Sequence, residues 1–120
     1  MSVKYALLIY AQEGGWDALS DDERKAITQQ YSDFGTWLSG RGWIRGGDQL
    51  AETSSATSVR VENGRTVTTD GPYAETKEQL GGFYLIECDN LDQAIEAASR
   101  IPAAQGGLIE VRPLMEFNQP

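Results

Sequence analysis

The side chains of this chain that could carry chemistry gather around one tight turn, Asp70-Gly71-Pro72-Tyr73. Gly71 tolerates unusual backbone angles and Pro72 fixes its own φ, so the turn would hold Asp70 rigidly. A carboxylate held in this way, if partly desolvated and facing a cleft, can have its pKa raised enough to exchange protons near neutral pH. The alternative is structural, because an Asp before Gly-Pro commonly forms the turn by bonding its own backbone. Asp70 is therefore a candidate general acid or base, with a turn-forming role left open.

The chain has no histidine and one cysteine among its 120 residues. Histidine is the commonest general base near neutral pH and the commonest metal ligand, so any catalysis must use carboxylates, Tyr, Lys or Arg. Cys88 ends an apolar run and is expected to be a buried thiol rather than a reactive one. The sequence has neither a glycine-rich phosphate loop nor the acidic spacing of a calcium loop, so we expect no cofactor and no metal.

Four further side chains are candidates for binding a ligand: Tyr73, Arg45, Arg112 and Glu110. Tyr73 adjoins the turn and either packs there or donates a proton. Glu110 and Arg112 are two residues apart on an expected strand and so share a face, where the arginine would bind a carboxylate-bearing ligand or pair with Glu110. Arg45 and Asp48 flank a Gly-Gly pair and would lie on opposite faces of a strand unless a bulge intervenes.

Hydrophobic periodicity predicts six strands and two helices that position these side chains. The strands are expected at residues 3–10, 43–50, 57–62, 65–69, 82–88 and 107–117, and the helices at about residues 21–40 and 91–102. Asn63-Gly64 predicts a tight hairpin turn, and the capping box that begins at Ser20 predicts the start of the first helix. The order predicts an α+β fold, a ferredoxin-like split βαβ sandwich with an inserted β-hairpin, in one domain spanning residues 1–120.

The strands at residues 3–10 and 82–88 are apolar on both of their alternating faces. Two helices can cover only one face of the expected sheet, and an apolar face left in water favours association. A second copy of the chain is the simplest covering, so we expect a homodimer.

Charge and hydropathy exclude several classes of partner. Ten basic and eighteen acidic residues give a net charge of −8, which repels nucleic-acid phosphates and anionic membrane surfaces. The sequence has no signal-peptide pattern and no apolar run near the ~20 residues that span a bilayer. We therefore expect a cytoplasmic protein that binds neither nucleic acid nor membrane.

Residues 70–84, DGPYAETKEQLGGFY, resemble the YCII-related proteins of the DGPF type. In that type, Asp-Gly-Pro and an aromatic residue are followed by Glu-Thr-Lys-Glu and a Gly-Gly-Phe-Tyr strand. The resemblance implies a dimeric α+β barrel, in which two sheets pack face to face and leave a cleft. In YCII-related proteins outside this subgroup, a histidine paired with an aspartate is regarded as the active site. This chain cannot form that pair.

Two functions of different classes remain open at this point. The first is binding of a small metabolite in the dimer cleft near the Asp-Gly-Pro turn, which the missing histidine favours. The second is a small-molecule lyase or isomerase with Asp70 as general acid and base, which depends on the resemblance more than on residues. A purely structural, self-assembling module would instead have a filled interface, so a pocket beside the turn would separate it from the other two.

Overall fold

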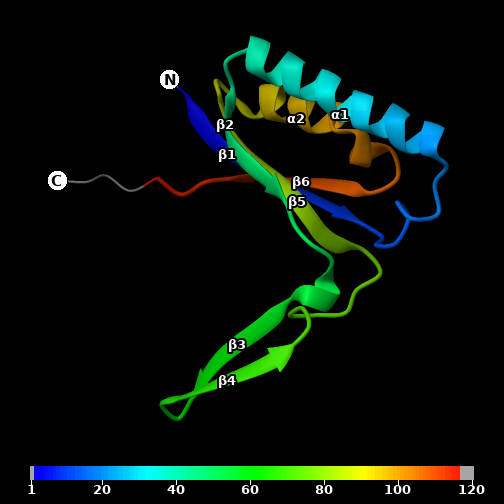
Figure 1. Cartoon of the computed structure of the whole chain (residues 1–120). Coiled ribbons are helices and arrows are strands. Elements are labelled where there is room, and N and C mark those ends of the chain that lie inside the picture. Colours follow the sequence, from blue (N-terminus) through cyan, green and yellow to red (C-terminus); the bar gives the residue numbers. More distant parts are fainter. Residues whose placement is uncertain (1, 117–120) are drawn as a thin grey trace.

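The computed structural model describes residues 2–116 and consists of a four-stranded sheet, two α-helices and a separate two-stranded hairpin (Figure 1). The sheet contains β1 (Val3–Ala11), β2 (Ile44–Gln49), β5 (Gln79–Cys88) and β6 (Leu108–Pro113). The hairpin consists of β3 (Thr57–Glu62) and β4 (Arg65–Asp70). The helices are α1 (Asp21–Gly40) and α2 (Leu91–Arg100), with short 3-10 turns η1 (Thr53–Ser55) and η2 (Pro102–Gln105). The last strand ends at Pro113 instead of the expected Phe117, which lies outside the described residues.

The sheet has the strand order β2-β5-β1-β6, and every neighbouring pair is antiparallel. The connections β1-α1-β2 and β5-α2-β6 are two interleaved βαβ units, so that β5 lies between the strands of the first unit and β1 between those of the second. Both helices cover the same face of the sheet (Figure 1). These features confirm the predicted ferredoxin-like α+β fold.

The hydrophobic core lies between this helix-covered face and the two helices. Leu7 on β1, Leu38 on α1 and Ile86 on β5 are each fully buried. Burying a side chain of this size stabilises a fold by roughly 1.5–3 kcal/mol. Helix α2 contributes small side chains, which let it approach the sheet closely; they are Ala94, Ala97 and Ala98. Within residues 2–116, neither helix is long and apolar enough to cross a membrane.

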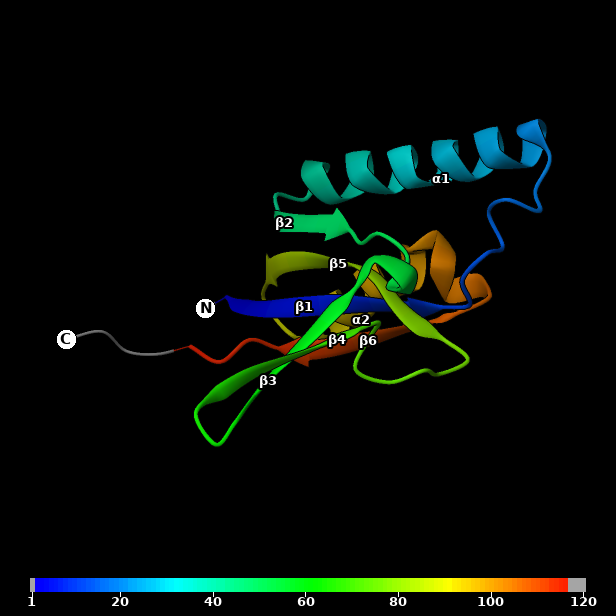
Figure 2. The same ribbon diagram turned by 60° about the horizontal axis from the view of Figure 1, so that its bottom comes forward.

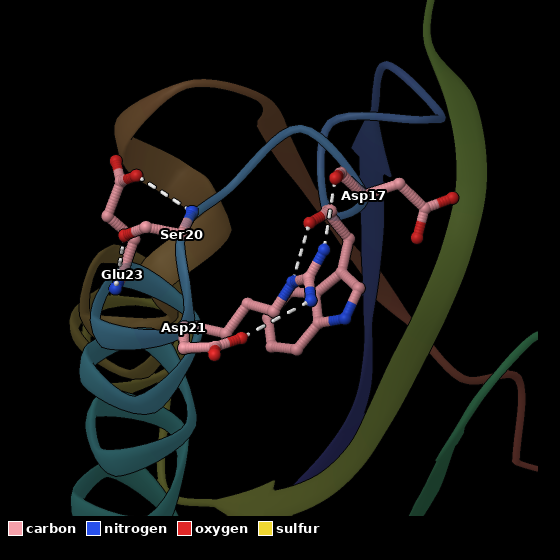
Figure 3. Close-up of polar contacts among 6 residues, drawn as sticks. Asp17, Ser20, Asp21 and Glu23 are labelled. Carbon is pink, nitrogen blue, oxygen red and sulfur yellow. Dashed lines mark hydrogen bonds and ion pairs between the residues drawn. The ribbon is translucent and has the colours of Figure 1, made fainter.

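Helix α1 begins at the predicted capping box (Figure 3). The backbone N–H of Glu23 donates to Ser20 Oγ at 3.1 Å, and the backbone N–H of Ser20 donates to Glu23 Oε1 at 3.0 Å. The Arg24 guanidinium donates to the backbone carbonyls of Trp16 and Asp17, each at 3.0 Å (Figure 3). These bonds satisfy free N–H groups of the first turn and tie the preceding loop to the helix.

Strand β2 contains a bulge at Arg45. Ile44 pairs with Ile86 and Gly46 with Leu85, so that Arg45 is the extra residue between two successive pairs. Such a residue shifts the alternation of the side chains that follow it. Arg45 and Asp48 therefore lie on the same face of the sheet. The sequence had predicted opposite faces for them unless a bulge intervened, and the bulge is present.

The face of the sheet opposite the helices has an apolar centre and charged edges; we refer to it as the open face. Its centre is formed by Ala6, Leu8, Phe83 and Leu85, which are buried or half-buried. Its edges carry Glu110 and Arg112 on β6, and Arg45 and Asp48 on β2. Both helices lie on the other side of the sheet (Figure 1). The prediction that β1 and β5 are apolar on both faces is confirmed.

The β3–β4 hairpin, residues 57–70, extends away from the sheet on the side opposite the helices (Figures 1 and 2); we refer to it as the arm. Its turn is formed by Asn63 and Gly64 with φ of 50° and 77°, the geometry that the sequence predicted. At its base, the Gly71 N–H donates to the Ala56 carbonyl at 2.7 Å, and Ser58 Oγ donates to the Gly71 carbonyl at 2.8 Å.

Two tyrosines lie half-buried between α1 and the sheet, Tyr31 on α1 and Tyr84 on β5. Burial raises the pKa of both hydroxyls, and a backbone hydrogen bond with Ala103 offsets part of the rise at Tyr31. A group whose pKa is higher in the folded than in the unfolded state stabilises the fold below its unfolded pKa. That contribution is lost as the pH rises through the folded pKa.

We expect the melting temperature to fall as the pH rises above about 10, where an unfolded tyrosine begins to ionise. Tyr84→Phe should flatten this fall, because phenylalanine has no proton to lose. Thermal unfolding followed by circular dichroism across this range would measure the slope. Tyr73→Phe is the matched control, since the Tyr73 side chain is 89% exposed. An equal alkaline slope in wild type and Tyr84→Phe would contradict the expectation.

Candidate functional site

A pocket of about 530 Å³ lies where the arm joins the end of the sheet; we refer to it as the arm-base pocket. Three stretches of chain form it: the segment after β1, the turn η1, and the loop between β4 and β5. Its volume is in the range of small-molecule sites. The lining residues are Gln12, Glu13, Thr53, Ser54, Gly71, Pro72, Glu75, Thr76, Lys77 and Gln79.

One wall of the pocket is a carboxylate held by η1. The Thr53 hydroxyl donates to Glu13 Oε1, and the Thr53 backbone N–H donates to Glu13 Oε2 at 2.7 Å. These two hydrogen bonds to the charged form lower the pKa of Glu13 below its ordinary value. The pocket therefore has a fixed negative charge that persists into mildly acidic solution.

The loop of residues 71–78 forms the opposite part of the pocket and is fixed by its own side chains. Gln79 Nε2 donates to the carbonyls of Ala74 at 3.1 Å and Thr76 at 3.2 Å, and the Thr76 hydroxyl donates to the Glu78 carbonyl. Lys77 also lines the pocket, and its ammonium forms no ion pair with any residue in 2–116. The pocket thus combines an anchored carboxylate with an ammonium group that is available to a ligand.

Asp70, the candidate acid or base, lies beside the pocket without lining it. It is the last residue of β4, opposite Thr57, and its side chain is exposed. Within residues 2–116 its carboxylate accepts no hydrogen bond, so the turn is closed by Gly71 and Ser58 instead of by Asp70. Gly71 has φ of 106°, which confirms the need for glycine there. Tyr73 points into solvent with 89% of its surface exposed.

The other three candidates lie on the open face and away from the turn, with Arg45 at the β2 edge and Glu110 and Arg112 at the opposite, β6 edge. Arg45 Nε is 3.2 Å from Glu87 Oε1, and its Nη1 donates to two backbone carbonyls at 2.8 Å each. Arg112 forms an ion pair with Glu110. Both arginines are thus paired with acidic residues of the same chain. For Arg112, the structure shows the ion pair with Glu110, which was one of the two roles expected from the sequence.

The structure therefore does not bring the predicted site residues together at one place. Asp70 and Tyr73 are at the base of the arm, while Arg45, Glu110 and Arg112 occupy the edges of the open face. Sequence reasoning did not single out the residues that shape the pocket with the turn, chiefly Gln12, Glu13, Thr53 and Gln79. No spacing rule links residues so far apart in the chain.

Residues 2–116 contain neither a cluster of metal-ligating side chains nor an exposed thiol. In residues 2–116, no three acidic or cysteine side chains are grouped as metal ligands. Cys88 is buried under the helices, and burial raises the pKa of its thiol, which keeps it protonated and unreactive near neutral pH.

Comparison with known proteins gives a family and no activity. An uncharacterized protein of Rhizobium meliloti (strain 1021) is 38% identical over 112 residues, covering 92% of this chain and 90% of that protein. The model of the YCII-related domain matches residues 3–118. This match includes the Asp-Gly-Pro turn, both helices and all six strands. The chain therefore belongs to the YCII-related family.

Proposed function

We propose that this protein binds a small polar metabolite in the arm-base pocket, as a homodimer and without histidine-based catalysis. The observation that carries the proposal is the pocket itself, which adjoins the Gly71-Pro72 turn and has the volume of a small-molecule site. Binding is favoured over turnover because the chain has no histidine and because Asp70 is exposed beside the pocket instead of desolvated within it.

The lining suggests the chemistry of the ligand. Glu13 provides a fixed negative charge and Lys77 a positive one, from segments far apart in the sequence. Ser54 and Gln12 add a hydroxyl and an amide group to a lining that is about equally polar and apolar. A metabolite with both an amino and a carboxylate group would satisfy both charges at once. We propose this class of ligand.

The homodimer is supported by the open face. Its apolar centre and charged edges have the composition of a protein interface, with a core that excludes water and a polar rim. A second copy that faces it would cover Leu8 and Phe83, and the two sheets would enclose a cleft. The arm-base pocket would lie at the rim of that cleft, because it adjoins the end of the same sheet.

A thermal-shift screen tests the binding proposal. The panel contains small metabolites with an amine, with a carboxylate or with both. A ligand at about 100 times its Kd stabilises by about 2.7 kcal/mol, which for a chain of this size raises the Tm by about 10 °C. We expect Glu13→Gln and Lys77→Gln to remove most of that shift. Glu116→Gln, an exposed carboxylate outside the pocket, is the charge-matched control.

Asp70→Asn separates binding from catalysis. Because Asp70 does not line the pocket, we expect this variant to keep the ligand shift. Turnover of the ligand by wild type that disappears in Asp70→Asn would favour the acid-base alternative. A shift that survives both pocket variants, or no shift across the panel, would overturn the proposed site.

A further inference from the structure

The arm is unusual because almost nothing in residues 2–116 covers it. All six residues of β4 and all of β3 except Ser58 are exposed, and the two strands pair only with each other. An isolated two-stranded hairpin is marginally stable in water. The Cα radius of gyration is 16.8 Å, whereas a compact domain of this length has about 14 Å. The chain has thus formed an extended feature that its own fold does not support.

The two faces of the arm differ in chemistry. Towards the tip of the arm, one face carries four uncharged, β-branched side chains, which we refer to as the valine face: Val59, Val61, Thr66 and Thr68. The carboxylate of Asp70 lies at the base of the same side of the hairpin, opposite Thr57. Val59 is 60% exposed and Val61 70% exposed. The opposite face carries the charges of Arg60, Glu62 and Arg65 beside Val67. The valine face thus leaves two large apolar side chains, Val59 and Val61, in water with no charged residue between them. Exposed apolar side chains grouped in this way indicate a face that packs against something.

The base of the arm keeps it extended. The bond from the Gly71 N–H to the Ala56 carbonyl and the bond from Ser58 Oγ to the Gly71 carbonyl join the two strands where they leave the body. A preorganised element loses less entropy on docking than a flexible loop. The valine face is therefore presented at a set position before any partner arrives.

We propose that the valine face docks on a second copy of this chain, so that in the dimer each arm clasps the partner. The choice of a second copy as the partner depends on the homodimer of the proposed function. The direction and length of the arm support this choice. The arm leaves the sheet on the side of the open face, where the second copy would lie (Figure 1). Six residues per strand extend about 20 Å, whereas facing sheets are about 10 Å apart. An arm of this length passes the partner's sheet.

Charge supports the same occupant. The arm contains two arginines and two acidic residues, so the whole net charge of −8 lies outside it. Two acidic bodies repel each other, and the arm has no net charge and carries four uncharged side chains on the outer part of one face. The arm can therefore approach the partner with less of that repulsion than the rest of the chain. An anionic membrane or nucleic acid would need a basic surface, which the valine face lacks.

Self-association of single variants tests the clasp. Val61→Asp places a charge on the valine face, and we expect it to raise the dimer Kd by about tenfold or more, as loss of a central interface side chain does. Val67→Asp is the matched control, with the same change on the same hairpin but on the opposite face, and should change the Kd less than about twofold. Sedimentation equilibrium measures both. Equal effects of the two variants, or no effect of Val61→Asp, would overturn the proposal.

Cross-linking gives a second readout that does not depend on stability. A photoreactive amino acid in place of Val61, in a mixture of 14N- and 15N-labelled chains, should produce cross-linked pairs that contain both labels. Cross-links confined to one chain, or formed only with other proteins in a lysate, would exclude a second copy as the occupant. If Leu8→Asp abolishes association while the arm variants do not alter it, the clasp fails and the homodimer stands. A wild type that is monomeric at every concentration would overturn both, and the ligand screen remains an independent test of the pocket.

Discussion

Gly47→Ala is expected to lower the free energy of unfolding by about 3 kcal/mol, among the larger effects of a single methyl group. A Cβ at this position would lie 2.5 Å from the carbonyl oxygen of Phe83 and 3.0 Å from Cα of Tyr84, both of them backbone atoms of β5. Backbone atoms within a sheet cannot move aside as the end of a flexible side chain can. The φ of 145° adds strain of its own for any residue with a side chain.

Gly46→Ala is the control for this prediction. It lies in the same bulged strand, and its added Cβ would meet only Leu85 Cδ1 at 3.7 Å, an ordinary contact. We expect a change below about 1 kcal/mol in either direction. Urea unfolding followed by circular dichroism measures both variants. If the two variants lost similar amounts of unfolding free energy, the close approach between β2 and β5 would not be the reason that position 47 needs glycine.

Leu8→Asp is expected to raise the dimer Kd by about a hundredfold or more, which corresponds to about 3 kcal/mol of association free energy. Leu8 lies at the centre of the open face, opposite Phe83 on one side and Glu110 on the other. In the proposed dimer a new carboxylate there would be buried without a cation to pair with it, and beside the negative charge of Glu110.

Sedimentation velocity over a range of concentrations measures this effect. Leu91→Asp is the matched control, because Leu91 is 50% exposed on the helix side of the sheet and begins α2, where an acidic side chain is favourable. It should leave the Kd unchanged. Circular dichroism establishes that each variant is folded. A Leu8→Asp protein that dimerises as tightly as wild type would exclude the open face as the interface.

Features that depend on neighbouring residues could be predicted from the sequence. The capping box of Ser20 and Glu23 predicted the start of α1, because both of its hydrogen bonds span three residues. Asn63-Gly64 predicted the hairpin turn, because only residues that tolerate positive φ fit it. The order of strands and helices then left few ways to assemble a sheet, and the resemblance carried by residues 70–84 is confirmed by a family match over residues 3–118.

The positions of the candidate site residues relative to one another could not be predicted in this way, because they depend on how distant segments fold together. Glu13, Thr53 and Lys77 come from three loops, and their proximity depends on how those loops cross the end of the sheet. The rigid turn at Asp70 was predictable, but its exposure was not, because desolvation is a property of the surroundings. The bulge at Arg45 and the position of the arm depend likewise on the pairing of distant strands. Local patterns fix backbone geometry over a few residues, whereas a pocket or an exposed face is set by contacts between segments far apart in the chain.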